Sequence, residues 1–172
     1  MAPTIREVTP GDAGALAEIH VRSWQTAYRG LLTDDYLDGL RAEDREERWR
    51  EVLANPPEGW RTWVAEDGGS VIGFATTGRS QDWDADDRTA EVLAIYLDPD
   101  AVEAGFGREL FAHAVGDLRE RGFRTATLWV LETNTHARRF YEIAGWRTDG
   151  VTTTQRVDCE NRSTIRYSVD LG

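Results

Sequence analysis

The sequence has a single cysteine and only three histidines among its 172 residues. Cys159 can form no internal disulfide, and no Cys-x-x-Cys pair is present to bind a metal. The histidines, His20, His113 and His136, lie too far apart in the sequence for a local zinc motif. We therefore expect no metal site. Cys159 has no neighbouring histidine in the sequence, so we also expect no cysteine nucleophile.

Lysine is absent: all twenty basic residues are arginine, against 31 acidic residues and a net charge of −11. Nucleic acids are bound largely through basic side chains that release counterions from the phosphates, so we expect no nucleic-acid partner. The acidic surface either attracts cationic ligands such as amines or serves only solubility. Individual arginines can still bind phosphate groups locally.

Long hydrophobic runs are also missing. No stretch approaches the roughly 20 apolar residues that a membrane-spanning helix needs, and residues 1–8 lack the pattern of a secretory leader. With 40% hydrophobic residues, the chain has the size and composition of one domain that buries its own core. We expect a single cytoplasmic domain, residues 1–172, without membrane contact.

The first third of the chain predicts a strand at residues 4–8 and then a helix. Thr9, Pro10 and Asp12 form a helix start, and the apolar positions that follow recur at helical spacing. Residues 31–40 are read as a loop with a short helix. A strongly charged helix is predicted at residues 43–54, where Asn55 and two prolines end it. Its expected buried side consists of Trp49, Val52 and Leu53.

The middle of the chain predicts a hairpin. Residues 60–65 and 71–77 are rich in strand-forming residues, and residues 66–70 between them contain Gly68 and Gly69. Residues 81–88 carry four aspartates and are interpreted as a solvated loop.

The second half repeats strand and helix, which is typical of strands flanked by packed helices. Both predicted helices carry one apolar stripe, and Gly122 and Gly145 stand where helix C-caps are expected. The predicted strands are residues 90–97, 126–131, 146–149, 152–158 and 164–170, and the helices are residues 106–121 and 135–144.

A glycine-containing turn joins the strand at residues 90–97 to the next helix. The segment Gly105-Phe106-Gly107-Arg108 precedes that helix, whose free amides and dipole favour a phosphate. No Gly-Lys-Ser/Thr follows, and Leu110 occupies the third glycine position of a dinucleotide fingerprint, so two common nucleotide loops are excluded. Taken alone, the pattern is equally compatible with a tight turn that binds nothing.

A second motif lies downstream: Asn134-Thr135-His136-Ala137-Arg138-Arg139-Phe140-Tyr141, followed by Gly145-Trp146. With these two ordered motifs and a strand between them, residues 90–149 resemble the GNAT superfamily of acyl-CoA N-acyltransferases. The resemblance implies an α/β (α+β) fold with a mixed, mostly antiparallel sheet of about seven strands and about four helices. It also implies that the sheet is split near Leu97 and Val130.

The same resemblance implies acetyl-CoA, or another acyl-coenzyme A, as cosubstrate. Its pyrophosphate would lie on the backbone at Ala104, Gly105, Phe106, Gly107 and Arg108. Val102 and Glu103 depart from the family pattern, which usually has Gln or Arg followed by Gly there. The pantetheine arm would follow the strand that contains Ile95, Tyr96 and Leu97. Asn134 matches a common contact, although it is also a good helix cap, and Arg138 is a candidate for the phosphates or an ordinary surface charge.

The resemblance further assigns chemical roles. Amine acylation needs a neutral amine, and only about one alkylamine in a thousand is neutral near pH 7. Glu91 matches a family base, with a solvated charge at a strand end as the alternative. Tyr141 matches the group that protonates the departing thiolate, with core packing as the alternative. The backbone N–H of Ile95 would face the carbonyl oxygen that gains negative charge.

By the same analogy, the acceptor wall would contain Trp24, Tyr28, Arg29 and Trp83. A small-molecule or peptide amine would be acylated by direct attack in a ternary complex. Two rival interpretations remain: a catalytically weak protein of this fold that binds coenzyme A as a sensor, and a partner-binding domain with no cofactor. Homodimers are common in the superfamily, and the sequence leaves this question open.

Overall fold

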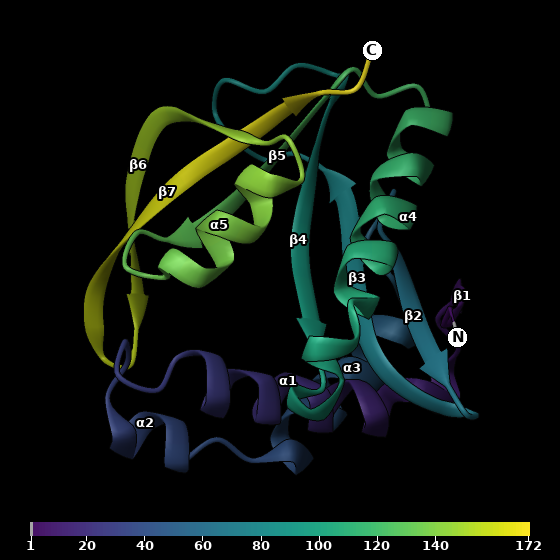
Figure 1. Ribbon diagram of the computed structural model, residues 1–172, viewed down its shortest axis with the longest axis vertical. Coiled ribbons are helices and arrows are strands. Elements are labelled where there is room, and N and C mark those ends of the chain that lie inside the picture. Colours follow the sequence, from purple (N-terminus) through teal and green to yellow (C-terminus); the bar gives the residue numbers. More distant parts are fainter. Residues whose placement is uncertain (1) are drawn as a thin grey trace.

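The computed structural model describes residues 2–172 and contains a seven-stranded sheet with helices on both faces (Figure 1). This confirms the expected fold class. In chain order the elements are β1 (Thr4–Glu7), η1 (Pro10–Asp12), α1 (Ala13–Ala27), α2 (Asp34–Asp38), α3 (Ala42–Ala54), β2 (Arg61–Asp67), β3 (Ser70–Arg79), β4 (Thr89–Leu97), η2 (Pro99–Ala104), α4 (Phe106–Glu120), β5 (Thr125–Leu131), α5 (Thr135–Ile143), β6 (Arg147–Val157) and β7 (Glu160–Asp170).

The strands are ordered β1-β2-β3-β4-β5-β7-β6, and only β4 and β5 run parallel. That parallel pairing is short: it joins residues 89–91 of β4 to residues 125–127 of β5 and then stops. Beyond Glu91 the two strands diverge, which Figure 1 shows as the opening between β4 and β5. The split expected between the ends of these strands is therefore present.

A β-bulge in β4 lies just beyond the last parallel pair. Thr77 of β3 pairs with Val92 and Thr76 pairs with Ala94, so Leu93 has no partner of its own on β3. A bulge of one residue reverses the alternation of side chains along a strand. Val92 packs in the cluster with α4, whereas Ala94 packs in the cluster with α1.

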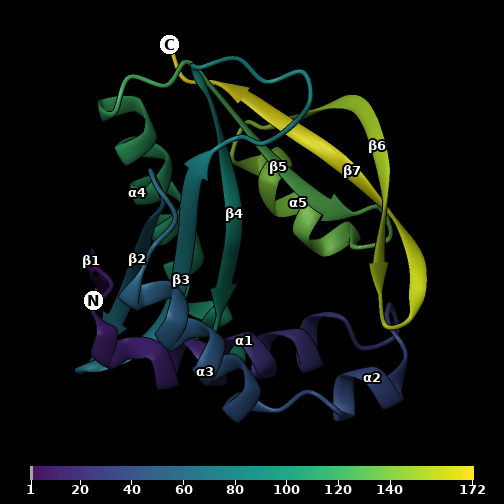
Figure 2. The same cartoon turned by 180° about the vertical axis from the view of Figure 1, so that it is seen from behind.

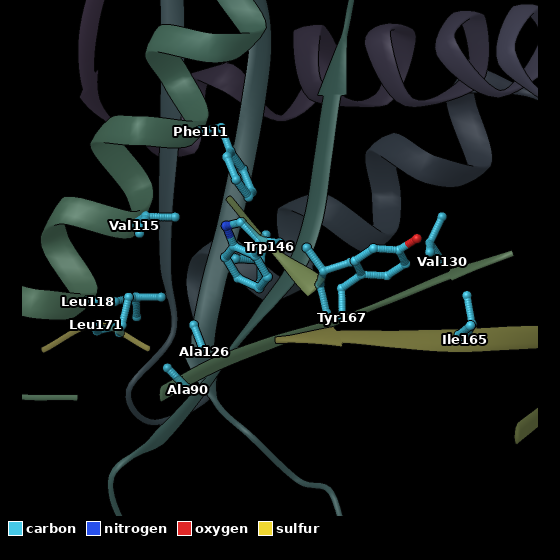
Figure 3. Close-up of a cluster of buried hydrophobic side chains, with 12 residues drawn as sticks. Ala90, Phe111, Val115, Leu118, Ala126, Val130, Trp146, Ile165, Tyr167 and Leu171 are labelled. Atoms are coloured by element: carbon cyan, nitrogen blue, oxygen red, sulfur yellow. The ribbon is translucent and has the colours of Figure 1, made fainter. Parts of the chain in front are cut away.

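The helices cover the sheet from two sides. α4 and α5 share one face with the largest hydrophobic cluster, which includes Phe111, Trp146 and Tyr167 (Figure 3). α1 and α3 lie on the other face, where Leu16 and Ile19 pack on Phe74. Figure 2 shows α3 in front of α1 on this second face. The second face of β5 and β7 is covered instead by the loop between β3 and β4.

Three local predictions are corrected. The hairpin between β2 and β3 turns on two residues, Gly68 and Gly69, both with positive φ, so its strands are longer than expected. The two strands predicted at residues 146–149 and 152–158 are one irregular strand, β6. The expected buried side of α3 is half-buried: α3 packs mainly on α1, and only Trp49 is shown to reach the sheet, with its ring centroid 5.2 Å from that of Phe74.

Candidate active site

The turn between β4 and α4 has the backbone geometry that the sequence predicts for anion binding. Gly105 has a φ of 82°, and it links η2 to the first turn of α4. Gly107 is buried in that first turn, and a Cβ atom there would lie 2.8 Å from Cδ1 of Leu97. Glycine at this position therefore allows the start of α4 to pack directly on the end of β4. Ala104, Gly105 and Arg108 are exposed, so their backbone is accessible to a ligand.

Val102 and Glu103, the two residues that depart from the family pattern, do not disturb the structure of this turn. Val102 and Glu103 both lie in η2 and are exposed. The turn is held to α1 by Arg22, which pairs with Asp98 and, at 2.9 Å, with Asp100. Glu103 adds negative charge near an expected phosphate site, but it does not fill the turn.

Glu91 lies at the last parallel pair, where β4 and β5 begin to separate. Its neighbours Ala90 and Val92 pack toward α4, so its side chain faces the opposite side of the sheet. Burial and then the charge of Asp82 raise the pKa of Glu91, a hydrogen bond from the Gln81 backbone and the charge of Arg166 lower it, and the resulting pKa is about 7. A carboxyl group with this pKa can accept a proton near neutral pH and return it.

Arg166 on β7 organises the surroundings of Glu91. Its guanidinium makes two parallel hydrogen bonds of 2.7 Å to Asp84, one of 3.0 Å to Asp82 and one of 2.7 Å to Asp149. The Arg166 side chain is only 7% exposed. It also lies 5.7 Å from the ring centroids of Trp83 and Trp129, within the range of a cation–π contact.

Residues 81–88 form the mostly exposed loop that the sequence predicts, and this network ties the loop to the sheet. Arg166 ties Asp82 and Asp84 to β7, and the Trp129 indole N–H donates a 3.0 Å hydrogen bond to Asp82. The loop is therefore fixed over the face of β5 and β7 that no helix covers. Nothing in the local sequence pairs Asp82 and Asp84 with an arginine about eighty residues away, so Arg166 was missed.

Tyr141 of α5 lies in an aromatic environment. Its ring centroid is 5.6 Å from that of Phe111 and 6.2 Å from that of Tyr167. Burial raises the pKa of the Tyr141 hydroxyl, and the nearby Tyr96 hydroxyl adds to the effect. Tyr141 is therefore protonated at neutral pH and able to donate.

Asn134 and Arg138 serve the structure in ways that bear on the predicted contacts. Asn134 is buried at the N-cap of α5, and its side-chain oxygen accepts a 3.1 Å hydrogen bond from the Ala137 backbone. Arg138 donates to the Tyr167 hydroxyl at 3.0 Å and to the carbonyl of Glu132 at 2.9 Å. These bonds hold Arg138 beside β5 and β7, so the structure does not bring it to the glycine turn at the start of α4.

The predicted acceptor residues lie in three places. Trp24 and Tyr28 are neighbours on α1, with ring centroids 4.8 Å apart, and Trp24 also lies 6.4 Å from the ring of Tyr96. Arg29 pairs instead with Asp34 at 3.1 Å and with Asp38 at 2.9 Å, so it fixes α2. Trp83 is 73% exposed and lies in the loop between β3 and β4, next to the guanidinium of Arg166.

His20 extends the aromatic group of α1 and was not predicted as a site residue. Its ring stacks on Tyr96 with centroids 4.9 Å apart, and neither ring nitrogen has a hydrogen-bond partner within residues 2–172. Burial, and after it the charges of Arg45 and Arg48, lower the pKa of His20 to about 4. The helical spacing of positions 20, 24 and 28 was the signal that could have identified it.

Two hollows accompany this arrangement. One, of about 150 Å³, lies beside the loop between β3 and β4 and is lined in part by Asp82, Asp149 and Arg166. The other, of about 220 Å³, lies between the end of α2 and α3. Within residues 2–172, no three histidine, cysteine or acidic side chains are grouped to hold a metal ion. No helix in the same part of the chain is long and apolar enough to cross a membrane.

A split sheet, a glycine turn at its opening and a neutral-pH base beside it are features of an acyltransferase, and comparison with known proteins gives the family. Residues 17–146 match the model of the acetyltransferase (GNAT) family, so the chain belongs to this family. As a member, it is an acyl-CoA-dependent N-acyltransferase.

Individual relatives agree with this assignment. The chain is 36% identical over 134 residues to YuaI of Bacillus subtilis, an uncharacterized N-acetyltransferase, covering 76% of this chain and 73% of YuaI. Two solved structures share the fold at low identity. PaiA N-acetyltransferase of Thermoplasma acidophilum, solved with coenzyme A, has a TM-score of 0.72 at 20% identity, covering 96% of this chain and 98% of that one. The yncA protein of Salmonella typhimurium, solved with its cofactor acetyl-CoA, has a TM-score of 0.75 at 21% identity, covering 100% and 95%.

Proposed function

We propose that this protein transfers an acetyl or other short acyl group from acyl-coenzyme A to a primary amine by direct attack within a ternary complex. The observation that carries the proposal is Glu91, a half-buried carboxyl group with a pKa of about 7 at the point where β4 and β5 separate. A base with this pKa suits proton removal from an amine at neutral pH.

The chain supplies a holding site for the cosubstrate at the turn before α4. Gly105 adopts positive φ, and neither Gly105 nor Gly107 has a side chain, so the backbone amides at the start of α4 are left uncovered by these two residues. Ala104, Phe106 and Arg108 complete the holding site. Exposed amides at a helix N-terminus bind the oxygens of a pyrophosphate without needing a particular side chain. Ile95, Tyr96 and Leu97 would border the rest of the cosubstrate, and Asn134 lies across the opening.

Three groups of the chain would act during transfer. Glu91 accepts the proton of the amine, directly or through water, as the amine nitrogen bonds to the acyl carbon. The Ile95 backbone N–H faces the acyl oxygen as its negative charge grows. Tyr141 gives its proton to the sulfur as the carbon–sulfur bond breaks, which balances the proton taken by Glu91. The acceptor approaches along Trp24 and Tyr28.

The test begins with calorimetric titration of the purified protein with acetyl-coenzyme A, followed by thiol release in the presence of a panel of amines. Saturable binding and amine-dependent release are expected. Glu91→Gln should reduce turnover by roughly 10²–10³-fold with little change in coenzyme A affinity, because it removes a proton acceptor and almost no binding surface. Glu120→Gln, at the exposed end of α4, is the matched control and should behave like the unaltered protein.

Two results would reject this function. Binding without turnover against every amine would favour a coenzyme A sensor. Failure to bind acetyl-coenzyme A or longer acyl derivatives would favour a partner-binding domain. A fully active Glu91→Gln variant would leave the reaction intact but remove Glu91 from it.

A further inference from the structure

Residues 24–40 join the two halves of the split sheet at the wide end of the opening, where β4 and β5 end. They comprise the last turn of α1, a tight turn and α2, and we call them the bridge segment. Figures 1 and 2 both show this segment running from α1, below β4, to the tip of the hairpin between β6 and β7. The earlier part of α1 is fixed to the β4 half of the sheet, because Leu16 and Ile19 pack on Phe74 of β3. The bridge segment therefore extends from one half of the sheet to the other.

Polar contacts make the bridge segment a single unit. Arg29 pairs with two aspartates of α2, and the Gln25 side chain donates a 3.0 Å hydrogen bond to the carbonyl of Leu37. The backbone N–H of Leu32 donates to the carbonyl of Tyr28 at 3.0 Å. These bonds connect the end of α1 to α2, so any displacement of α2 also displaces Tyr28.

Two aromatic side chains of the bridge segment lie at the opening. The ring centroid of Trp24 is 6.4 Å from that of Tyr96, the residue that follows Ile95, and 4.8 Å from that of Tyr28. Trp24 and Tyr28 also pack against a buried cluster that contains Leu131, the last residue of β5. The expected acceptor wall thus lies against both β4 and β5, and its position depends on how the far end of the bridge segment is held.

Asp158, in the loop between β6 and β7, holds that far end. Its carboxylate is fully buried and accepts a 2.9 Å hydrogen bond from the backbone N–H of Thr33, the N-cap residue of α2. Arg162 of β7 donates to both carboxylate oxygens, and this contact lowers the pKa of Asp158. Asp158 is therefore ionised at neutral pH, and an ionised acceptor makes a stronger hydrogen bond than a neutral one.

The backbone of the hairpin loop determines where Asp158 points. Asp158 and Cys159 are its only two residues, and their φ angles are 50° and 65°. Positive φ at both positions is the conformation of a type I′ turn, in which aspartate is one of the few favoured residues other than glycine and asparagine. The turn directs the Asp158 side chain inward to Thr33 and leaves Cys159 exposed. Two neighbouring positions therefore share one backbone conformation, and only one of them contacts the bridge segment.

We propose that Asp158 is a positioning residue for the amine acceptor: through Thr33 it holds the bridge segment on the β5 half of the sheet and keeps Trp24 and Tyr28 at the opening. The inference rests on the proposed function for its link to acyl transfer. Without this hydrogen bond the wall occupies its position for only a fraction of the time, and the acceptor binds more weakly by that fraction. The turn between β4 and α4 belongs to other elements, so the cosubstrate site is unaffected.

The first variant removes the Asp158 side chain without straining the turn. Asp158→Gly retains the positive φ, which glycine adopts freely, and Cys159→Gly at the next position is the matched control. For any amine that is acylated, Asp158→Gly should raise the acceptor KM roughly tenfold, the effect of losing one hydrogen bond to a charged group. Because bound acceptor restores the wall, kcat and the Kd of acetyl-coenzyme A should stay close to those of the unaltered protein. Asp158→Asn keeps an acceptor oxygen for Thr33 and should recover most of the loss.

A second variant breaks the same hydrogen bond from its other side. Thr33 has a φ of −65°, which proline also adopts, and Thr33→Pro removes the N–H donor. Its acceptor KM should rise as in Asp158→Gly, and the double variant should be no weaker than either single variant, because both remove one interaction. An unchanged acceptor KM in both single variants, or an equal loss of affinity for acetyl-coenzyme A, would overturn the proposal.

Hydrogen exchange tests the hold on the bridge segment without turnover. In Asp158→Gly, peptides that cover residues 29–41 should exchange faster than in the unaltered protein or in Cys159→Gly, while peptides from β2 and β3 keep their rates. Unchanged exchange of residues 29–41 would overturn the proposal. If no amine is acylated, the proposed function fails by itself, and the exchange rates still decide whether Asp158 holds the bridge segment.

Discussion

At the scale of single residues, Glu91 shows how its position determines its chemistry. A carboxyl group ordinarily loses its proton near pH 4.5, and burial beside Asp82 raises the pKa of Glu91 to about 7. Arg166 moderates the rise without neutralising the site. Glu91 is therefore half-ionised near neutral pH, the condition in which a base both accepts and releases protons readily.

The pH dependence of activity follows from this value. Because only ionised Glu91 can accept the proton, we expect kcat/KM for a fixed amine to rise with pH through about 7, after correction for the ionisation of the amine itself. The pH profile of the unaltered protein should show this step, and the residual activity of Glu91→Gln should not. A step near pH 4.5 instead would show that Glu91 is solvated and is not the base.

Ionised Glu91 should also lower the stability of the folded protein above about pH 7. The folded-state pKa of Glu91 lies above its ordinary value, so the protonated form favours folding. This contribution is complete below about pH 4.5 and is lost as the pH rises through about 7. After allowance for solvent screening, we expect Glu91→Gln to be more stable than the unaltered protein at pH 8, by about 1–2 kcal/mol. Urea denaturation at pH 5 and pH 8 measures this: the gain should be present at pH 8 and smaller at pH 5.

At the scale of elements, the turn from β4 to α4 depends on one close contact. A Cβ at position 107 would lie 2.8 Å from Leu97, closer than van der Waals contact allows. We expect Gly107→Ala to cost about 1 kcal/mol and to weaken acetyl-coenzyme A binding, because the Leu97 side chain must rotate away from the start of α4. Gly116→Ala, in the middle of α4 with open space around it, is the control and should not destabilise the protein. Unchanged affinity in Gly107→Ala would separate the turn from coenzyme A binding.

The loop between β3 and β4 depends on Arg166 in a comparable way. Arg166→Met leaves Asp82, Asp84 and Asp149 close together without their cation, which we expect to lower the free energy of unfolding measured by urea denaturation. Since Arg166 also lowers the pKa of Glu91, the activity step should move above pH 7. Arg156→Met, at an exposed position on β6, is the control. If Arg166→Met is as stable as the unaltered protein and its activity still rises through about pH 7, the loop keeps its position without Arg166.

At the scale of the whole molecule, the sheet consists of two halves joined by three residue pairs between β4 and β5. Past Glu91, the amides of β4 that face β5 have no ladder partner on that side. We expect them to exchange hydrogen rapidly in the free protein and slowly when acetyl-coenzyme A occupies the opening. Hydrogen exchange of peptides that cover residues 92–97 tests this, with β2 and β3 as an internal reference. Equal exchange with and without the cosubstrate would place it elsewhere.

Local patterns in the sequence predicted the elements well, but not the contacts between distant ones. The glycine turn, the helix with Asn134 and Tyr141, and the strand with Glu91 follow from nearby residues. The bulge at Leu93 was not predicted, because it is defined by pairing with β3 and not by the β4 sequence. The same holds for Arg166, whose partners come from another strand and a loop.

The bulge at Leu93 determines which face of the sheet Glu91 and Tyr96 occupy. Glu91 and Tyr96 are five residues apart, an odd separation that would put them on opposite sides of a regular strand, yet both face the side of α1 because one residue is taken out of the alternation. A deletion of Leu93 would leave every other side chain unchanged, but it would turn either the base or the aromatic wall into the hydrophobic core beneath α4. In β4, therefore, one residue without a partner decides whether the base and the wall can meet the same substrate.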